Sequence, residues 1–370
     1  MVKFSDLSKV NHPYSEELKA VASEVIDSGR YLFGPKVLEF ETKLKSYLNS
    51  KHVVGVGNGL DALRLIFLAY IEKGDLKKGD EVLIPANTFV ATILSIIHAG
   101  LVPKLIEPSL DTYNLDLNQL ESKIGPKTKA IVLVHLYGRA CWDDELLFLA
   151  EKNKLKIVED NAQAFGAEWK GIKTGVLGHA AAFSFFPTKI LGALGDAGAI
   201  ATKDEELADI IQKLSNYGAG KKNHLSYKGF NSRMDELQAA FLMVKMKYVD
   251  QENQYRRILA DAYLSHIQTP VIVLPIIDRP KTNTLHVWHL FVIRSPKRDD
   301  LRDFLLKNGI ETQIHYPIPP HQQEAFFEFS HLSLSITEKI HREVISLPLD
   351  PSITLDEVKF VADHINNFTA

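Results

Sequence analysis

Cysteine is almost absent from this chain, since its 370 residues include a single one, Cys141. One cysteine excludes an internal disulfide and any zinc site built from several cysteines. No nucleophile signature surrounds Cys141, so we expect a buried or half-buried thiol without a chemical role. We predict no metal site.

Long apolar runs and an excess of charge of one sign are also missing. The most apolar stretches are too short, or too interrupted by charges, to span a bilayer. Residues Met1–Asp6 contain no apolar segment of the kind that a signal peptide needs. The formal net charge is −3, which does not indicate a nucleic acid or an anionic membrane as partner. We therefore expect a soluble, cytoplasmic protein.

Between about residues 52 and 202, short apolar runs alternate with helical patterns. The runs are apolar along their whole length, as in parallel strands that helices cover on both faces. Alternating strands and helices predict an α/β sheet. The expected strands are Val53–Val56, Glu81–Ile84, Val102–Glu107, Ala130–Val134, Lys156–Val158, Ala182–Phe185 and Gly198–Ala201.

The alternation ends after Lys203, and a different arrangement follows. We predict a large domain over residues 1–250, including an N-terminal arm, and a smaller α/β domain over residues 251–370. Prolines at positions 270, 275 and 280 lie just beyond this boundary. Helices are expected at 203–216, 234–248, 299–308, 338–345 and 355–368, and strands at 286–294 and 312–316.

The first candidate site is the segment Gly55-Val56-Gly57-Asn58-Gly59-Leu60, between an expected strand and an expected helix. Glycines there let backbone N–H groups approach an anion, and the start of the helix adds a favourable dipole. The segment differs from a dinucleotide-binding fingerprint, because its third glycine comes one residue early. A phosphate site and a plain tight turn both remain open.

Two further segments carry a pair of acids and a lysine. Glu159 and Asp160 end an expected strand, where they would repel each other if both were buried, so one of them should face a cation. Lys189 follows an aromatic strand and precedes a glycine-rich turn. Apolar surroundings free a lysine amine for Schiff-base chemistry. Taken singly, a strand-end acid is often a helix cap, and a loop lysine is often a surface residue.

Together these three features match the needs of pyridoxal phosphate, whose phosphate requires backbone amides, whose ring nitrogen requires a carboxylate and whose aldehyde requires a lysine. Several further motifs occur along nearly the whole chain, and in this order they resemble the DegT/DnrJ/EryC1/StrS family of sugar aminotransferases. They include Ser28-Gly29-Arg30-Tyr31, Pro85-Ala86-Asn87-Thr88-Phe89, Glu159-Asp160-Asn161-Ala162-Gln163, Asn231-Ser232-Arg233 and His315-Tyr316-Pro317.

The resemblance implies the fold of type I pyridoxal-phosphate transferases, which is α/β with a mostly parallel seven-stranded sheet in the large domain and a small C-terminal α/β domain. It implies that Lys189 binds the cofactor covalently and moves a proton between sugar and cofactor. It implies that Asp160 pairs with the pyridinium nitrogen. Further implied cofactor contacts are Gly59, Leu60, Phe89, Gln163, Ser184 and Asn231, and implied substrate contacts are Tyr31, His315, Tyr316 and His321.

By the same resemblance, the Phe89 ring stacks on the cofactor, Gln163 contacts its 3-oxygen, and the Ser184 hydroxyl joins backbone amides at the phosphate. Asn231 is implied to reach the cofactor phosphate of a second subunit, so the expected active unit is a homodimer. One position departs from the family, whose members usually carry Thr or Ser where this chain has Leu60. One hydroxyl of the phosphate site is therefore missing.

The sequence around Leu60 resembles the subgroup that acts on dTDP-3-oxo-6-deoxyhexoses. The implied reaction moves the amino group of L-glutamate to the sugar and yields a dTDP-3-amino-3,6-dideoxyhexose. A 4-keto or UDP-linked sugar is the alternative substrate. Dehydratases of the same fold carry histidine at the position of Lys189, which disfavours them. A non-catalytic regulatory protein is disfavoured because Lys189, Asp160, Gln163 and Ser184 are all present.

Overall fold

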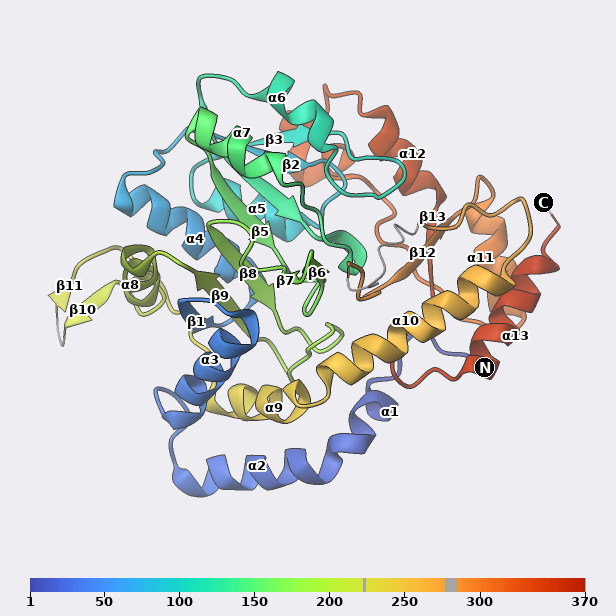
Figure 1. Ribbon diagram of the computed structural model, residues 1–370, viewed down its shortest axis with the longest axis horizontal. Helices are drawn as coiled ribbons and strands as arrows, with labels where there is room; N and C mark the ends of the chain where they lie inside the picture. The colour runs from blue at the N-terminus through green and yellow to red at the C-terminus, as the bar shows by residue number, and fades with distance from the viewer. Residues whose placement is uncertain (222–223, 277–284, 370) are drawn as a thin grey trace.

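The computed structural model describes residues 1–221, 224–276 and 285–369, and its centre is a seven-stranded sheet (Figure 1). The strand order is β1-β9-β8-β5-β4-β2-β3. Neighbouring strands pair in parallel from β8 to β3, whereas β9 runs antiparallel to both β8 and β1. The mostly parallel sheet predicted from the sequence is confirmed. Its strands are β1 (His52–Val56), β2 (Glu81–Pro85), β3 (Val102–Ile106), β4 (Thr128–Val134), β5 (Lys156–Asp160), β8 (Ala180–Ser184) and β9 (Gly198–Thr202).

Helices cover both faces of this sheet, and an apolar core lies on each face. Strand β4 contributes side chains to both cores. Ala130 and Val132 face one core, and Ile131 and Leu133 face the other, because side chains alternate along a strand. Both faces are therefore apolar, as the sequence predicted. The first core includes α4 (Gly59–Lys73), α5 (Val90–His98) and α8 (Glu205–Leu214), and the opposite face is covered by α3 (Pro35–Leu48), α7 (Glu145–Asn153) and α9 (Glu236–Met246).

The strands that carry candidate site residues end at the same edge of the sheet. The parallel strands β5 and β8 end at Asp160 and Ser184. β1 has the same direction as β8, since both run antiparallel to β9, so the chain leaves β1 at that edge too. There Asn58 begins α4, and its side-chain oxygen accepts the Asp61 N–H at 2.8 Å. In open α/β sheets, ligands bind at this edge.

Helix α10 (Val249–His266) links the sheet to the C-terminal part of the chain (Figure 1). Its Leu259 and Tyr263 pack into a separate apolar core there, which also includes Val2. Val2 forms a parallel bridge with Ile310, so the first residues lie against the C-terminal part. The boundary at residue 250 stays a prediction. The C-terminal elements are α11 (Arg298–Lys307), α12 (Ser335–Glu343), α13 (Leu355–Asn366) and the antiparallel pair β12 (Phe291–Arg294) and β13 (Val344–Leu347).

Two strand predictions in the C-terminal part need correction. The strand predicted at 286–294 begins only at Phe291, because Trp288 has a φ of 53°, outside the range of extended backbone. The strand predicted at 312–316 is wrong, since a single bridge at Gln313 stands in its place. The prolines that follow lack the N–H groups that a continued ladder would need.

One helix was missed and one helix prediction needs correction. The sequence did not predict α10, whose exposed residues are mostly polar and whose mean hydropathy is negative. The helix predicted at 338–345 ends at Glu343, and the next four residues form β13 instead. Periodicity alone does not distinguish such a short apolar run from a buried helical turn.

Pro280, one of the three prolines near the predicted boundary, lies outside the described residues. Within residues 1–221, 224–276 and 285–369, no helix has the length and apolarity needed to cross a bilayer. In the same part of the chain, no three His, Cys, Asp or Glu side chains are grouped so that they could hold a metal ion.

The packing of α10 yields a stability prediction. Leu259 is fully buried in the C-terminal core, whereas its neighbour Ile258 is 45% exposed. We expect Leu259→Ala to lower the free energy of unfolding by about 2–5 kcal/mol, because the cavity loses both transfer energy and contacts. Ile258→Ala is the matched control and should have a much smaller effect in the same chemical denaturation experiment. Equal effects of the two variants would contradict the assignment of α10's buried face.

Candidate active site

Asp160, the last residue of β5, lies buried at the sheet edge. Its Oδ2 accepts the Thr92 hydroxyl at 2.8 Å, and its Oδ1 accepts the Ala162 N–H at 3.2 Å. Thr88 Oγ1 lies 2.7 Å from Thr92 Oγ1. An ionised carboxylate only accepts, so Thr92 donates to Asp160 and Thr88 donates to Thr92. Burial raises the pKa of Asp160, while these bonds and the Lys189 charge oppose the rise.

The neighbouring acid, Glu159, is also buried but points to the opposite face of the sheet. It accepts N–H groups of Gly175 and Gly178 at 2.7 and 2.8 Å, and its Oε2 lies 2.9 Å from His135 Nε2. His135 Nδ1 accepts the Cys141 N–H, so the hydrogen of the ring is on Nε2, which donates a hydrogen bond to Glu159. The expectation that one of the two acids faces a cation is met by Asp160, which interacts with the Lys189 charge, whereas neutral donors satisfy Glu159.

Cys141 is buried, as the sequence predicted. Burial raises the pKa of its thiol to about 12. A thiol that stays protonated at neutral pH is a poor nucleophile, which agrees with the absence of a chemical role.

Lys189 lies in the loop between β8 and β9, half-buried and close enough to Asp160 for their charges to interact. Burial lowers its pKa to about 8, and the negative charge of Asp160 counteracts part of that effect. Among the described residues, Lys189 Nζ has no hydrogen-bond or ion-pair partner. A lysine amine that is partly neutral near pH 8 and unpaired is available as a nucleophile and as a base.

An anion site lies where α4 begins. The Asn58 side chain accepts the hydrogen bond of the Asp61 N–H. The N–H groups of Gly59 and Leu60, in the first turn, have no partner inside the helix. A Cβ atom placed on Gly59 would lie 2.7 Å from Ser184 Cβ. Gly59 is thus required for the close approach of the helix start to the end of β8, which brings the Ser184 hydroxyl beside two free amides.

Gln163 ties the strand edge to the C-terminal part of the chain. Its Oε1 accepts the Tyr137 N–H at 2.6 Å, and its Nε2 donates to the Tyr316 hydroxyl at 3.2 Å. The Tyr316 ring lies 5.3 Å from the Phe89 ring, measured between centroids. Burial raises the pKa of Tyr316, and the charge of Asp160 adds to the rise. Phe89, Gln163 and Tyr316 therefore gather near Asp160, and their contacts with cofactor and substrate stay predictions.

The two predicted histidines lie in different surroundings. His315 Nδ1 lies 2.9 Å from Ser346 Oγ, and burial together with the positive charge of Lys189 lowers its pKa to about 4. His315 is therefore neutral at pH 7 and lies near the lysine. His321 is buried in the C-terminal part, with its Nε2 3.2 Å from Glu338 Oε1. No contact among the described residues joins His321 to Lys189, so its role at the substrate stays a prediction.

Tyr31 and Asn231 lie on other segments than those that carry Lys189 and Asp160. Tyr31 is 54% exposed between α2 (Ser15–Ser28) and α3, and its carbonyl accepts the Glu236 N–H at 3.1 Å. Asn231 is exposed and forms a backbone bridge with Asn216. Among the described residues, no side-chain contact brings either of them to Lys189.

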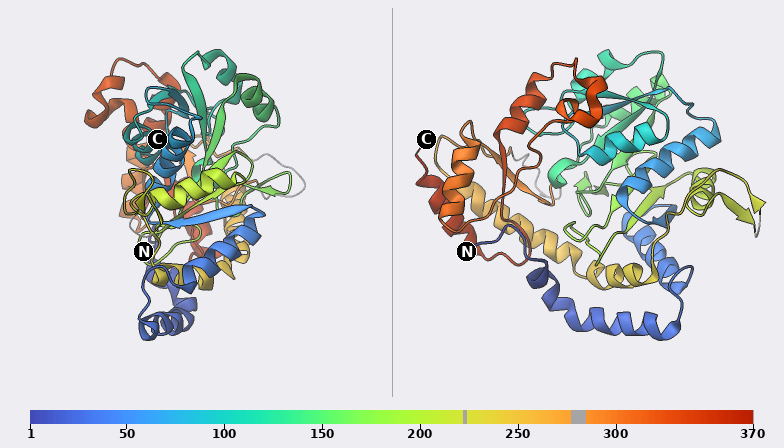
Figure 2. Two further views of the ribbon diagram at one scale, coloured as in Figure 1. Left: turned by 90° about the vertical axis from the view of Figure 1, so that its left-hand side faces the viewer. Right: turned by 180° about the vertical axis from the view of Figure 1, so that it is seen from behind.

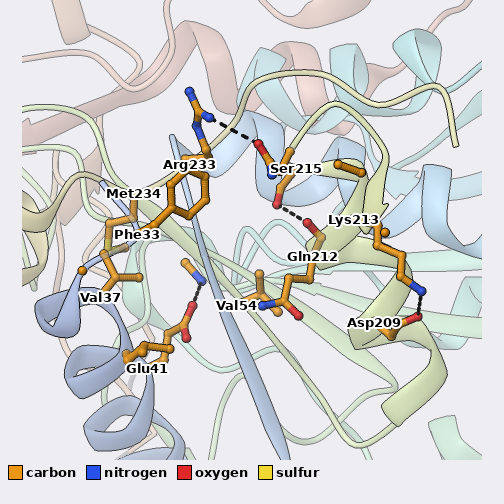
Figure 3. A pocket seen from close by; sticks show the side chains of 16 residues that line it. Phe33, Val37, Glu41, Val54, Asp209, Gln212, Lys213, Ser215, Arg233 and Met234 are labelled. Carbon is orange, nitrogen blue, oxygen red and sulfur yellow. Dashed lines mark hydrogen bonds and ion pairs between the residues drawn. The ribbon is translucent and has the colours of Figure 1, made fainter. Parts of the chain in front are cut away.

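A pocket between α3 and α8 is lined in part by residues that follow Tyr31 and Asn231 closely in the chain (Figure 3). Its volume is about 450 Å³. Glu41 lines it, accepts the Gly55 N–H at 2.7 Å and has a pKa that burial raises. The Arg233 guanidinium donates to Asn216 at 3.2 Å and lies 5.1 Å from the exposed Phe33 ring. No residue predicted for the cofactor lines this pocket.

The sequence did not identify Thr92, although it holds Asp160 directly. Thr88 and Thr92 stand four residues apart at the start of α5, which places both on one side of a helix beginning. This spacing could have indicated a pair of hydroxyls on one side of the helix. It could not have indicated that they face Asp160 at the end of β5. Tyr137 was missed for a stronger reason, because its contribution is a backbone N–H.

The chain is similar to known proteins over nearly its whole length. Residues 13–366 match the DegT/DnrJ/EryC1/StrS aminotransferase family. The dTDP-3-amino-3,6-dideoxy-alpha-D-galactopyranose transaminase of Aneurinibacillus thermoaerophilus is 47% identical over 368 residues, covering 100% of this chain and 99% of that protein. The crystal structure of S. venezuelae DesV superposes with a TM-score of 0.94 at 40% identity, covering 99% and 98%. NtdA from Bacillus subtilis, solved with bound cofactor PMP, gives 0.90 at 34% identity, covering 99% and 85%.

The pair of opposite charges yields a prediction for the cofactor-free protein. The acylation rate of Lys189, followed by mass spectrometry of its peptide, should rise with pH around a midpoint near 8. Asp160→Asn should shift the midpoint to lower pH, because the Asp160 charge favours the ammonium form. The exposed Asp196, in the same loop, provides the control Asp196→Asn, which should leave the midpoint unchanged. An unchanged midpoint in Asp160→Asn would exclude the charge interaction.

Proposed function

Because this chain belongs to the DegT/DnrJ/EryC1/StrS aminotransferase family, we propose that it moves the amino group of L-glutamate to carbon 3 of a dTDP-linked 3-oxo-6-deoxyhexose. The chain is a sugar-nucleotide aminotransferase, its fold is that of the pyridoxal-phosphate transferases, and its cofactor is pyridoxal 5′-phosphate. The observation that carries the proposal is the unpaired amine of Lys189 beside the buried Asp160 carboxylate.

The described residues fit this cofactor. The free N–H groups of Gly59 and Leu60 and the nearby Ser184 hydroxyl suit a phosphate. Burial alone raises the pKa of Asp160, and a cationic ring nitrogen would supply the charge that keeps its carboxylate ionised. Lys189 offers an amine that has no hydrogen-bond or ion-pair partner in the part of the chain that the structure describes. Three groups of different chemistry therefore lie at one sheet edge: hydrogen-bond donors for the phosphate, a carboxylate for the ring nitrogen and an amine for the aldehyde.

When bound, pyridoxal phosphate accepts an amino group and withdraws electrons from the reacting carbon. Lys189 Nζ, with a pKa near 8, takes the proton of the donor's α-carbon in the first half of the cycle. In the second half it delivers a proton to the sugar carbon. Asp160 would keep the ring nitrogen of the bound cofactor protonated, and the Thr88–Thr92 hydroxyl chain holds the carboxylate in position for that role.

Other residues would orient the cofactor and exclude water. Phe89 would stack on the ring, and its neighbour Tyr316 would close the side toward the C-terminal part. Gln163 would turn toward the 3-oxygen from the position that Tyr137 fixes. Leu60 provides its backbone amide alone, so the phosphate site depends on main-chain donors more than in relatives with a hydroxyl there.

The dTDP-linked 3-keto sugar is proposed because the Aneurinibacillus relative, at 47% identity, is named for a dTDP-3-amino-3,6-dideoxy sugar. A 4-keto or UDP-linked sugar is the alternative within the same family. The relative named as a pleiotropic regulatory protein is more distant, at 37% identity. The half-buried Lys189 and the buried Asp160, whose charges interact, have no evident use in a purely regulatory protein. The cytoplasmic location stays a prediction.

We also propose that the active unit is a homodimer. Tyr31, Phe33 and Tyr217 expose 54%, 69% and 51% of their surface, and large aromatic side chains in such a group indicate an interaction surface. Strands β10 (Ala219–Lys221) and β11 (His224–Leu225) follow Tyr217 in the chain and project from the body of the molecule (Figure 2). Asn231 lies between α8 and α9, in the same stretch of chain as Tyr217 and the two strands. This position supports its predicted contact with the cofactor phosphate of the other subunit.

The reaction is tested by incubating the purified protein with L-glutamate and dTDP-linked 3-keto, dTDP-linked 4-keto and UDP-linked 3-keto sugars. We expect 2-oxoglutarate and aminosugar from the dTDP-linked 3-keto sugar. Lys189→Ala should abolish the visible absorption band of the cofactor bound to the lysine, and it should lower turnover by about 10³-fold or more. Lys19→Ala, which removes an exposed lysine, is the control and should behave as wild type. Wild-type turnover in Lys189→Ala, or amination of the 4-keto sugar alone, would refute the corresponding part of the proposal.

The dimer is tested by mixing two defective proteins. Asn231→Ala should weaken cofactor retention, and Lys189→Ala should remove the reactive amine. A mixed dimer then has one site in which Lys189 of the first protein meets Asn231 of the second, so activity should return after mixing and refolding. No recovery, with mixed dimers shown by mass spectrometry, would place Asn231 at its own chain's site or outside it.

A further inference from the structure

A fully buried lysine, Lys245, lies on α9 and takes no part in the chemistry proposed above. It is 4% exposed, and its Nζ donates to the Gly192 carbonyl at 2.7 Å. Among the described residues, Gly192 O is its one hydrogen-bond acceptor. A buried ammonium with so few partners is unfavourable, and an apolar side chain would pack there at lower cost. The position of Lys245 therefore requires an explanation.

The acceptor, Gly192, lies in the loop that carries Lys189, three residues further along the chain. This loop folds back on itself, since a Cβ atom on Gly192 would lie 2.3 Å from the Pro187 carbonyl oxygen. Ala193 N donates to Phe185 O at 2.8 Å and closes the loop at its base. A contact with the Gly192 carbonyl therefore acts on a short closed segment that contains Lys189.

A second polar contact runs from the same helix to the same loop. Gln238 Oε1 accepts the Leu194 N–H at 3.0 Å. Gln238 and Lys245 are seven residues apart, so they lie on one face of α9 two turns from each other. Between them on that face is Leu242, fully buried in the core that contains Ile190, Leu191 and Ala193. One helix face thus holds the loop by two hydrogen bonds and the apolar packing between them.

We propose that Lys245 and Gln238 are positioning residues for Lys189, which hold its loop so that the amine stays desolvated beside Asp160. The inference rests on the proposed role of Lys189. The neighbouring charges of Lys245 come from α10, where Glu252 and Arg256 lie close enough to affect its titration. Burial lowers the pKa of Lys245 to about 8, so its ammonium form still predominates at pH 7.

The test uses two variants, Lys245→Met and Gln238→Leu, in the cofactor-free and the loaded protein. Loosening the loop lets water reach Lys189, so the midpoint of Lys189 acylation should move up from about 8 toward the ordinary lysine value in both variants. In the loaded enzyme, kcat should fall on the order of tenfold to a hundredfold with KM for glutamate nearly unchanged. Lys247→Met, which removes an exposed lysine at the end of the same helix, should leave both quantities unchanged.

Gln238→Leu removes no charge, which separates loop positioning from a simple charge effect of Lys245. A shifted midpoint in Lys245→Met with a wild-type midpoint in Gln238→Leu would overturn the proposal in favour of the charge effect. Two folded variants with the wild-type midpoint and kcat would overturn it as well. If Lys245→Met does not fold, Gln238→Leu decides alone. A shifted midpoint in a protein that transaminates no sugar would sustain the positioning role and refute the proposed reaction instead.

Discussion

The burial of Lys189 next to Asp160 is the constraint on which the rest of this site depends. The charged form of each group alone would be unfavourable in these surroundings, since burial raises the pKa of the acid and lowers that of the amine. Their mutual attraction offsets part of both shifts without joining them in a direct ion pair. The amine therefore stays unpaired and partly neutral near pH 8, which is the state that covalent attachment and proton transfer require.

The surrounding structure keeps this arrangement in place from several directions. Two threonine hydroxyls in series hold Asp160 from the start of α5, and a face of α9 holds the Lys189 loop. The C-terminal part adds Tyr316 and the neutral His315 to the same place. A site shared by the sheet edge and the C-terminal part depends on how α10 positions the two relative to each other (Figure 1).

Much of the fold followed from local patterns. Seven apolar runs predicted seven strands, because a strand covered on both faces has no polar side to interrupt it. The C-terminal part was less predictable. Its β13 is a four-residue run without a period of its own, and α10 is largely polar, so burial of these segments becomes apparent only in the folded chain. Glu159 and Asp160 are both buried, and the expected cation faces Asp160 in the form of Lys189. The sequence did not indicate that backbone N–H groups would satisfy Glu159 on the opposite face of the sheet.

By itself the sequence determined the chemical parts: the lysine, the strand-end carboxylate, the glycine at the helix start and the order of motifs that identifies the family. Residue type and spacing suffice for these, because such chemistry requires a particular functional group at the end of a strand. Only the tertiary structure decided the pKa of Lys189, the Thr92 support of Asp160 and the contact between Lys245 and the lysine loop. Desolvation and hydrogen bonds between segments far apart in the chain arise from packing, and no local pattern records them.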